Sequence, residues 1–139
     1  MIAEGDVFLD SNILVYTDDH RYPHKQTIAA DLVRSCFRRR KGVVSTQVLQ
    51  EYFSAATRKL RLGPDYAKGK VRFFAGFDLF RIGREDILAA IDLHGIHKIA
   101  FWDGLIVRAA LESGCSVLYS EDLQSGRRID GLEIVNPFL

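Results

Sequence analysis

The order of hydrophobic and polar residues predicts a strand near the start of the chain that ends at a carboxylate. Residues 7–9 form a continuous apolar run, which is typical of strands buried on both faces of a parallel sheet. Asp10, Ser11 and Asn12 follow at once, and short polar side chains of this kind favour turns and helix starts. Asp10 is therefore expected at the carboxyl end of a central strand, where open α/β sheets bind their ligands.

Helical periodicity alternates with further short apolar runs. Five helices are expected. The first spans about 24–40, the second begins at 45–46 and carries Glu51, and the third begins at Pro64. The fourth lies between Gly83 and Gly95, and the fifth spans 101–113. In the helix that Gly95 is expected to close, the residues expected to face inward are Ile87, Leu88 and Ile91.

Further strands are expected at 43–44, 79–82, 115–119 and 132–135. Strands that alternate with helices indicate a three-layer α/β/α sandwich around a mostly parallel sheet, with right-handed crossovers. A length of 139 residues suits a single domain over 1–139.

Composition excludes some classes of protein without choosing a function. A net charge of +1 favours no particular partner, although Arg38-Arg39-Arg40-Lys41 and similar groups are local basic clusters. Solvated helix faces are the simpler interpretation of each cluster. Cys36 and Cys115 suggest buried, reduced thiols. The start of the chain lacks a signal-peptide pattern and no apolar run suits a membrane span, so we expect a cytoplasmic protein with no membrane partner.

Four acidic residues distant in sequence are candidates for one cleft: Asp10, Glu51, Asp103 and Asp122. Asp122 follows the predicted strand at 115–119, much as Asp10 follows the first strand, and Asp103 lies in the first turn of a helix. Acids gathered in one cleft raise one another's pKa unless a cation neutralises them. Carboxylates suit Mg²⁺ or Mn²⁺, and the chain has no Cys/His set with zinc spacing. Such ions activate water and stabilise a phosphodiester under attack, which is nuclease chemistry.

Four segments of the chain resemble the PIN-domain ribonucleases, and more narrowly the toxins of VapC type from toxin-antitoxin pairs. They are 8–12 (FLDSN), 45–52 (STQVLQEY), 101–106 (FWDGLI) and 118–124 (LYSEDLQ). Each is weak alone, but four in order make a fairly specific signal that covers nearly the whole chain. The resemblance implies a PIN-like fold and a metal-dependent endoribonuclease, the toxin of a type II toxin-antitoxin system.

The resemblance also implies roles for individual residues. The metal-binding acids of the family fall on Asp10, Glu51, Asp103 and Asp122, and Asn12 falls on a polar position that helps to hold the first acid. Asp10 and Asp103 are expected to be direct ligands, Asp122 a direct or water-mediated ligand, and Glu51 a group that positions the attacking water or helps to hold a second ion. Ser11 and Ser120 are expected to hydrogen-bond these carboxylates.

Simpler interpretations exist for several of these residues. Taken alone, Asp10 is typical of a turn residue or a helix cap, and Asp103 is typical of an acid that stabilises the positive N-terminus of a helix. Glu121 adjoins Asp122 and competes with it, but residues adjacent on a strand point to opposite faces, and we favour Asp122. Trp102 is expected in the core, and the four histidines are expected to be structural or exposed.

Two other functions stay open. An aspartate-based phosphatase or phosphotransferase also has an acid after its first strand, but its usual signature needs a second aspartate where this chain has Asn12. A non-catalytic metal-binding or interaction module of the same fold is the alternative outside enzymes.

The resemblance further implies an RNA substrate, a cognate antitoxin and a homodimer. The helices over 47–76, with Phe53, Phe73 and Phe74, are candidates for the antitoxin contact, although a core role suits these phenylalanines equally.

Overall fold

The computed structural model describes residues 5–139, which form six strands and six helices. The strands are β1 (Val7–Leu9), β2 (Gly42–Ser45), β3 (Asp78–Phe80), β4 (Val117–Tyr119), β5 (Arg128–Ile129) and β6 (Leu132–Val135). The helices are α1 (Ser11–Tyr16), α2 (Pro23–Arg39), α3 (Thr46–Arg58), α4 (Pro64–Phe74), α5 (Arg84–His97) and α6 (Phe101–Glu112).

The six strands form one sheet in the order β3-β2-β1-β4-β6-β5. Every neighbouring pair is parallel except β5 with β6. The chain moves from β1 to β2 on one side and later returns to β4 on the other side of β1. The strand order therefore reverses beside β1, and a crevice for ligands is expected at the carboxyl ends of β1 and β4.

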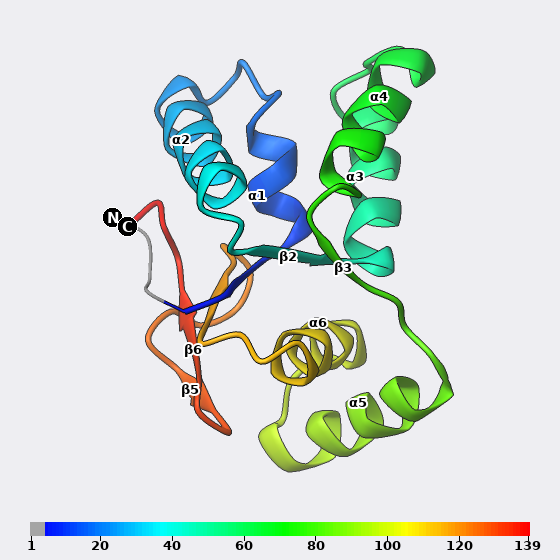
Figure 1. The fold of residues 1–139 in the computed structure, drawn as a ribbon, viewed down its shortest axis with the longest axis vertical. Helices are drawn as coiled ribbons and strands as arrows, with labels where there is room; N and C mark the ends of the chain where they lie inside the picture. Colours follow the sequence, from blue (N-terminus) through cyan, green and yellow to red (C-terminus); the bar gives the residue numbers. More distant parts are fainter. Residues whose placement is uncertain (1–4) are drawn as a thin grey trace.

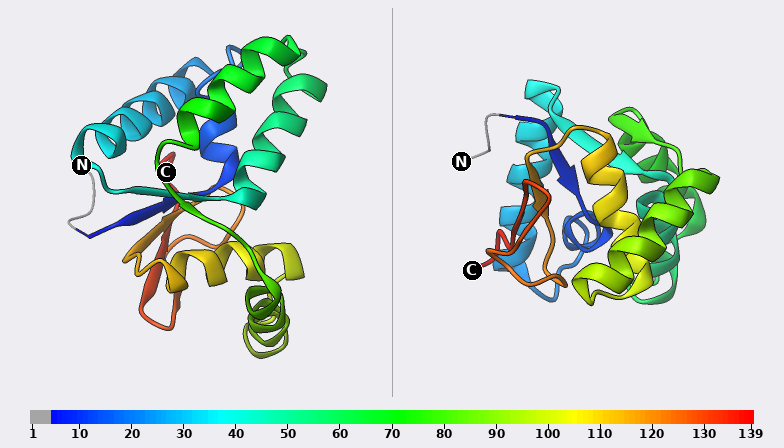
Figure 2. Two further views of the ribbon diagram at one scale, coloured as in Figure 1. Left: turned by 45° about the vertical axis from the view of Figure 1, so that its right-hand side comes forward. Right: turned by 90° about the horizontal axis from the view of Figure 1, so that it is seen from below.

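Helices cover both faces of the sheet. Helices α1 to α4 lie on one side and the α5–α6 pair lies on the other (Figures 1 and 2). The expected three-layer sandwich with a mostly parallel sheet is therefore confirmed.

The hydrophobic core lies on both sides of β1, whose three residues are fully buried. The predicted strand at 7–9 and the predicted helix at 101–113 are confirmed, and Gly114 takes the left-handed conformation (φ 74°) just beyond α6. Within residues 5–139, no helix is both long and apolar enough to cross a membrane.

The expectations for α5 are wrong in two respects. The helix continues through Gly95 to His97, and Lys98 takes the left-handed conformation that ends it. Ile87, Leu88 and Ile91 do not face inward, since 42 to 51% of their surface is exposed. The buried face of α5 is instead set by Ala90, whose carbonyl oxygen would lie 2.8 Å from a Cβ added at Gly104 of α6. This close approach of two backbones leaves the larger apolar side chains outside.

A polar cluster around Asp18 connects α1, α3 and α4. The buried carboxylate of Asp18, just after α1, accepts hydrogen bonds from the hydroxyls of Tyr52 and Tyr66, each at 2.7 Å. The Lys70 ammonium of α4 lies 3.2 Å from the same carboxylate. A buried charge with three donors fixes α3 against its neighbours.

Two glycines test the packing of this core. Gly42→Ala is expected to lower the free energy of unfolding by about 2 kcal/mol, because a Cβ there would lie 2.6 Å from the Phe77 ring and 3.0 Å from the Cys36 Cβ. Gly95→Ala is the control, since no atom of the described residues outside its own helix turn lies within 4 Å of its added Cβ. That change should raise stability by roughly 0.5–1 kcal/mol. Urea unfolding followed by circular dichroism measures both, and equal effects of the two substitutions would contradict this account of the core.

Candidate functional site

Neighbouring strands bring Asp10 and Ser120 together at the carboxyl edge of the sheet. Leu9 pairs with Tyr119 at the ends of β1 and β4, so the next residue of each strand lies at the same edge. The Ser120 hydroxyl donates a hydrogen bond of 2.8 Å to the Asp10 carboxylate. Asp10 also caps α1, because its carboxylate accepts from the Ser11 backbone N–H at 2.7 Å.

The Asp10 carboxylate is buried in an environment that disfavours its charge. Only 4% of the residue is exposed. Burial, above all, and the negative charges of Glu51 and Asp122 together raise the pKa of Asp10 to about 7, against the hydrogen bonds from Ser120 and Ser11 that lower it. A carboxylate whose charge is disfavoured in this way favours a nearby cation.

The side-chain amide of Asn12 connects Asp10 with Asp122. Its nitrogen lies 3.4 Å from an Asp10 oxygen and 3.1 Å from an Asp122 oxygen. The same nitrogen lies 3.4 Å from the Ser120 hydroxyl. Its oxygen accepts from the Glu121 backbone N–H at 3.1 Å, so one amide spans the ends of both strands.

Helix α3 brings Glu51 to the same group of residues. The Ser45 hydroxyl caps α3 by accepting from the Val48 N–H, which fixes the start of the helix before Glu51. The Ser11 hydroxyl donates to one Glu51 oxygen at 3.0 Å, and the Gln47 amide donates to the other at 3.2 Å. Glu51 is therefore linked through Ser11 to the residue that follows Asp10.

Asp103 lies in the first turn of α6 and is half-buried. Burial raises its pKa, and the charges of Asp122 and Glu51 add to the effect. Within residues 5–139, its carboxylate accepts no hydrogen bond. A partly desolvated carboxylate without a donor, beside two further acids, is suited to a positively charged ligand.

Gln47 is a site residue that the sequence alone did not reveal. Its amide nitrogen bridges Glu51 and the backbone oxygen of Trp102, at 3.2 Å each, and so connects α3 with the first turn of α6. Its oxygen is buried and without a hydrogen-bond partner among the residues described. If the amide rotated to exchange its nitrogen and oxygen, the oxygen would face the two acceptors on Glu51 and Trp102. The oxygen therefore stays without a partner because the nitrogen forms the bridge.

Glu121 is held away from the acid cluster. Its carboxylate accepts from the Tyr16 hydroxyl at 2.5 Å and forms an ion pair with Lys25 of α2. The Lys25 ammonium lies 5.0 Å from the centre of the Tyr16 ring. Glu121 and Asp122 thus have separate partners, and Asp122 is the one that shares Asn12 with Asp10.

The expectation that Trp102 anchors the core is wrong, because 64% of this residue is exposed. It sits on the second position of α6, next to Asp103, with its ring 5.1 Å from the Phe101 ring. His20 and His24 are exposed as expected, and a His94 ring nitrogen lies 2.6 Å from the backbone oxygen of Ile99.

The donor set fits a hard divalent cation by its chemistry. The four carboxylates supply only oxygen, Asp10 and Asp103 have raised pKa values, and the charges that help to raise them are negative. Among residues 5–139, however, no three or more His, Cys, Asp or Glu side chains lie close enough together to hold a metal ion in the arrangement described. In this arrangement the four acids are therefore spread too widely to form a ready metal site.

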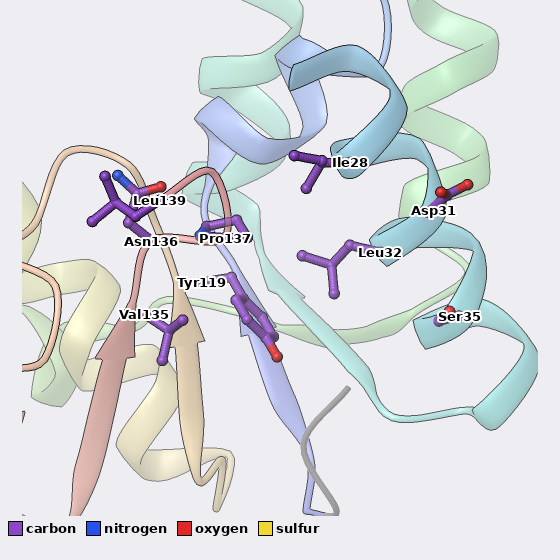
Figure 3. A pocket seen from close by; sticks show the side chains of 9 residues that line it. All are labelled: Ile28, Asp31, Leu32, Ser35, Tyr119, Val135, Asn136, Pro137 and Leu139. Atoms are coloured by element: carbon purple, nitrogen blue, oxygen red, sulfur yellow. The ribbon is translucent and has the colours of Figure 1, made fainter. Parts of the chain in front are cut away.

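A separate hollow of about 460 Å³ lies between α2 and the end of the chain (Figure 3). Ile28 and Leu32 of α2 face Tyr119 and Pro137 across it. Asp31 is the one acid among the described residues that line it, so this hollow is distinct from the acid cluster.

A family model described as the PIN domain matches residues 7–131. Among solved structures, a toxin-antitoxin complex from Klebsiella pneumoniae matches with a TM-score of 0.67 and 15% identity, covering 95% of this chain and 98% of that chain. DNA-bound VapBC from Salmonella typhimurium matches with a TM-score of 0.65 and 19% identity, covering 94% and 96%. The sarcin-ricin-loop-cleaving toxin VapC20 of Mycobacterium tuberculosis matches with a TM-score of 0.62 and 16% identity, covering 84% and 90%. A search of curated proteins finds no match.

The raised pKa of Asp10 predicts a pH-dependent stability in chelator. Because the folded protein binds this proton more tightly than the unfolded chain, stability should fall as pH rises from 3.8 to about 7. Asp10→Asn removes the buried charge and should raise the melting temperature at pH 8 by roughly 5 °C, with little change at pH 4. Scanning calorimetry with EDTA measures this, with exposed Asp92→Asn of α5 as the control. If the Asp10→Asn variant is less stable than wild type at pH 8, the raised pKa of Asp10 is refuted.

Proposed function

Since the chain belongs to the PIN domain family, whose model matches residues 7–131, we propose that it is a metal-dependent endoribonuclease, the toxin component of a type II toxin-antitoxin system. The proposed substrate is RNA in the cytoplasm, and the proposed cofactor is Mg²⁺ or Mn²⁺.

One observation carries the proposal: four acids come from four separate segments, and the charges of Glu51 and Asp122 act on both Asp10 and Asp103. Asp10 and Asp122 share the Asn12 amide, and the pKa values of Asp10 and Asp103 are raised first by burial and then by the charges of Glu51 and Asp122. Fold stability gives no reason to gather four carboxylates, since like charges make a neighbouring acid harder to ionise. A ligand that brings positive charge supplies the reason.

In the proposed mechanism, Asp10 and Asp103 would hold the cation directly, and Asp122 would do so directly or through water. When bound, the cation supplies an activated water and stabilises negative charge on the phosphodiester. Glu51 positions the attacking water or helps to hold a second ion, and its aim is set by Ser11 and Gln47. Ser11, Asn12 and Ser120 orient the carboxylates through the hydrogen bonds described above.

We also propose a cognate antitoxin and a homodimer as partners. Two structural neighbours are themselves toxin-antitoxin assemblies, which supports an antitoxin here. The exposed Phe53 and Phe73, on α3 and α4, stay candidates for that contact, and a hollow of about 550 Å³ lies beside Phe53. Phe74 is fully buried in the core and therefore offers no docking surface.

Asp103→Asn tests the proposed function. Initial cleavage rates of a labelled RNA with Mn²⁺ should fall at least about a hundredfold, because a ligand that stabilises transition-state charge is removed. Glu112→Gln, an exposed acid at the end of the same helix, is the matched control and should cleave at the wild-type rate. Chelation with EDTA should abolish cleavage by wild type.

Two results would contradict the proposal. If Asp10→Asn and Asp103→Asn both cleave as fast as wild type after repurification, the site is assigned wrongly. If wild type binds Mn²⁺ but hydrolyses no RNA across several substrates, the chain is a non-catalytic module of this fold.

A further inference from the structure

A hollow of about 470 Å³ leads away from the acid cluster along α3. Its lining begins at Ser11 and Glu51, passes Ser54 and Ala55, and ends at Arg58 and Lys59. Glu51, Ser54, Ala55 and Arg58 follow one another at the spacing that places helix residues on a single face. The two small side chains in the middle leave the surface hollow between the acidic and basic ends.

The basic end of the hollow carries two exposed cations, Arg58 in the last turn of α3 and Lys59 at its cap. Among residues 5–139, neither side chain forms an ion pair or a hydrogen bond. Two other lysines, by contrast, are already engaged, since Lys25 pairs with Glu121 and Lys70 with Asp18. Arg58 and Lys59 are therefore available to an anionic ligand.

We propose that this hollow binds the phosphate backbone of the RNA strand beside the scissile phosphodiester, with Arg58 and Lys59 as the phosphate-binding residues. The proposal rests on the proposed ribonuclease function and adds the path of the substrate and its direction along α3. The negative charge of RNA is repelled by Glu51 and attracted by Arg58, so a phosphate settles at the basic end of the hollow.

The length of the hollow suits a short run of nucleotides. Arg58 lies seven positions after Glu51 on α3, which corresponds to about 10 Å along the helix axis. That distance covers only a few nucleotides of a single strand, counted from the reacting phosphate. Contacts to phosphates carry no base information, so the hollow adds affinity and register and leaves sequence choice to other residues.

A helix C-terminus favours cations whether or not a ligand binds, and this effect supplies the control. Arg39 also lies in the last turn of a helix, α2, is exposed, and has no ion pair among the residues described. It lines no part of the hollow beside Glu51. If surface charge alone determines RNA affinity, substitution of Arg39 weakens binding as well. If the hollow is a phosphate site, only substitution of Arg58 and Lys59 weakens it.

The first test measures binding without cleavage. The probe is a fluorescein-labelled single-stranded oligoribonucleotide of about 12 nucleotides, titrated with the full chain in EDTA. The double variant Arg58→Ser/Lys59→Ser should raise Kd about tenfold and reduce the salt dependence of log K by roughly 0.7 for each phosphate that is no longer neutralised. Arg39→Ser should change neither quantity. Equal Kd values and salt slopes for the double variant, the control and wild type would overturn the proposal.

The second test places charge inside the hollow. Ser54 is exposed, so Ser54→Glu and Ser54→Gln should fold alike while they differ in charge. Ser54→Glu should weaken RNA binding several-fold more than Ser54→Gln, and equal effects of the two would overturn the proposal. In cleavage assays with Mn²⁺, the fall of kcat/KM in the Arg58→Ser/Lys59→Ser variant should come from a raised KM. If wild type does not cleave RNA, the proposed function fails. The binding measurements still show separately whether the hollow binds the RNA backbone.

Discussion

The Asn12 amide is the contact on which the geometry of the acid cluster depends. It donates to carboxylates that follow two different strands and accepts from the backbone just after β4. Asp10 and Asp122 repel each other, yet both lie within reach of this one neutral donor. A neutral amide holds two like charges close together without neutralising them, so the carboxylates still favour the binding of a cation.

The helices distribute the remaining acids around this centre. α3 and α6 lie on opposite sides of the sheet, and the Gln47 amide joins them by donating to Glu51 and to the Trp102 carbonyl. An unsatisfied buried oxygen costs free energy, of about 1–3 kcal/mol. Its presence beside the acids follows a common pattern, in which local rules of stability are broken at functional sites and compensated by the surrounding core.

Much of the fold follows from short-range patterns. Residues 7–9 and 117–119 are buried apolar runs, so their pairing and the edge they share follow from composition and parallel topology. The orientation of α5 does not, because it depends on the close approach of Ala90 to Gly104 and small residues give no periodic signal. Likewise, neither the Gln47 bridge nor the exposed position of Trp102 is encoded locally, since each requires two helices in place. The metal-binding roles of the four acids stay predictions.

The Asp18 cluster has a consequence for the aim of Glu51. Tyr52 is the next residue along α3, and successive side chains of a helix project about 100° apart. The hydroxyl of Tyr52 is bonded to the buried Asp18 carboxylate, which lies away from the site. α3 therefore cannot turn about its axis to re-aim Glu51 without breaking that bond. The angular setting of the acid is governed by an aromatic residue that never reaches the cleft.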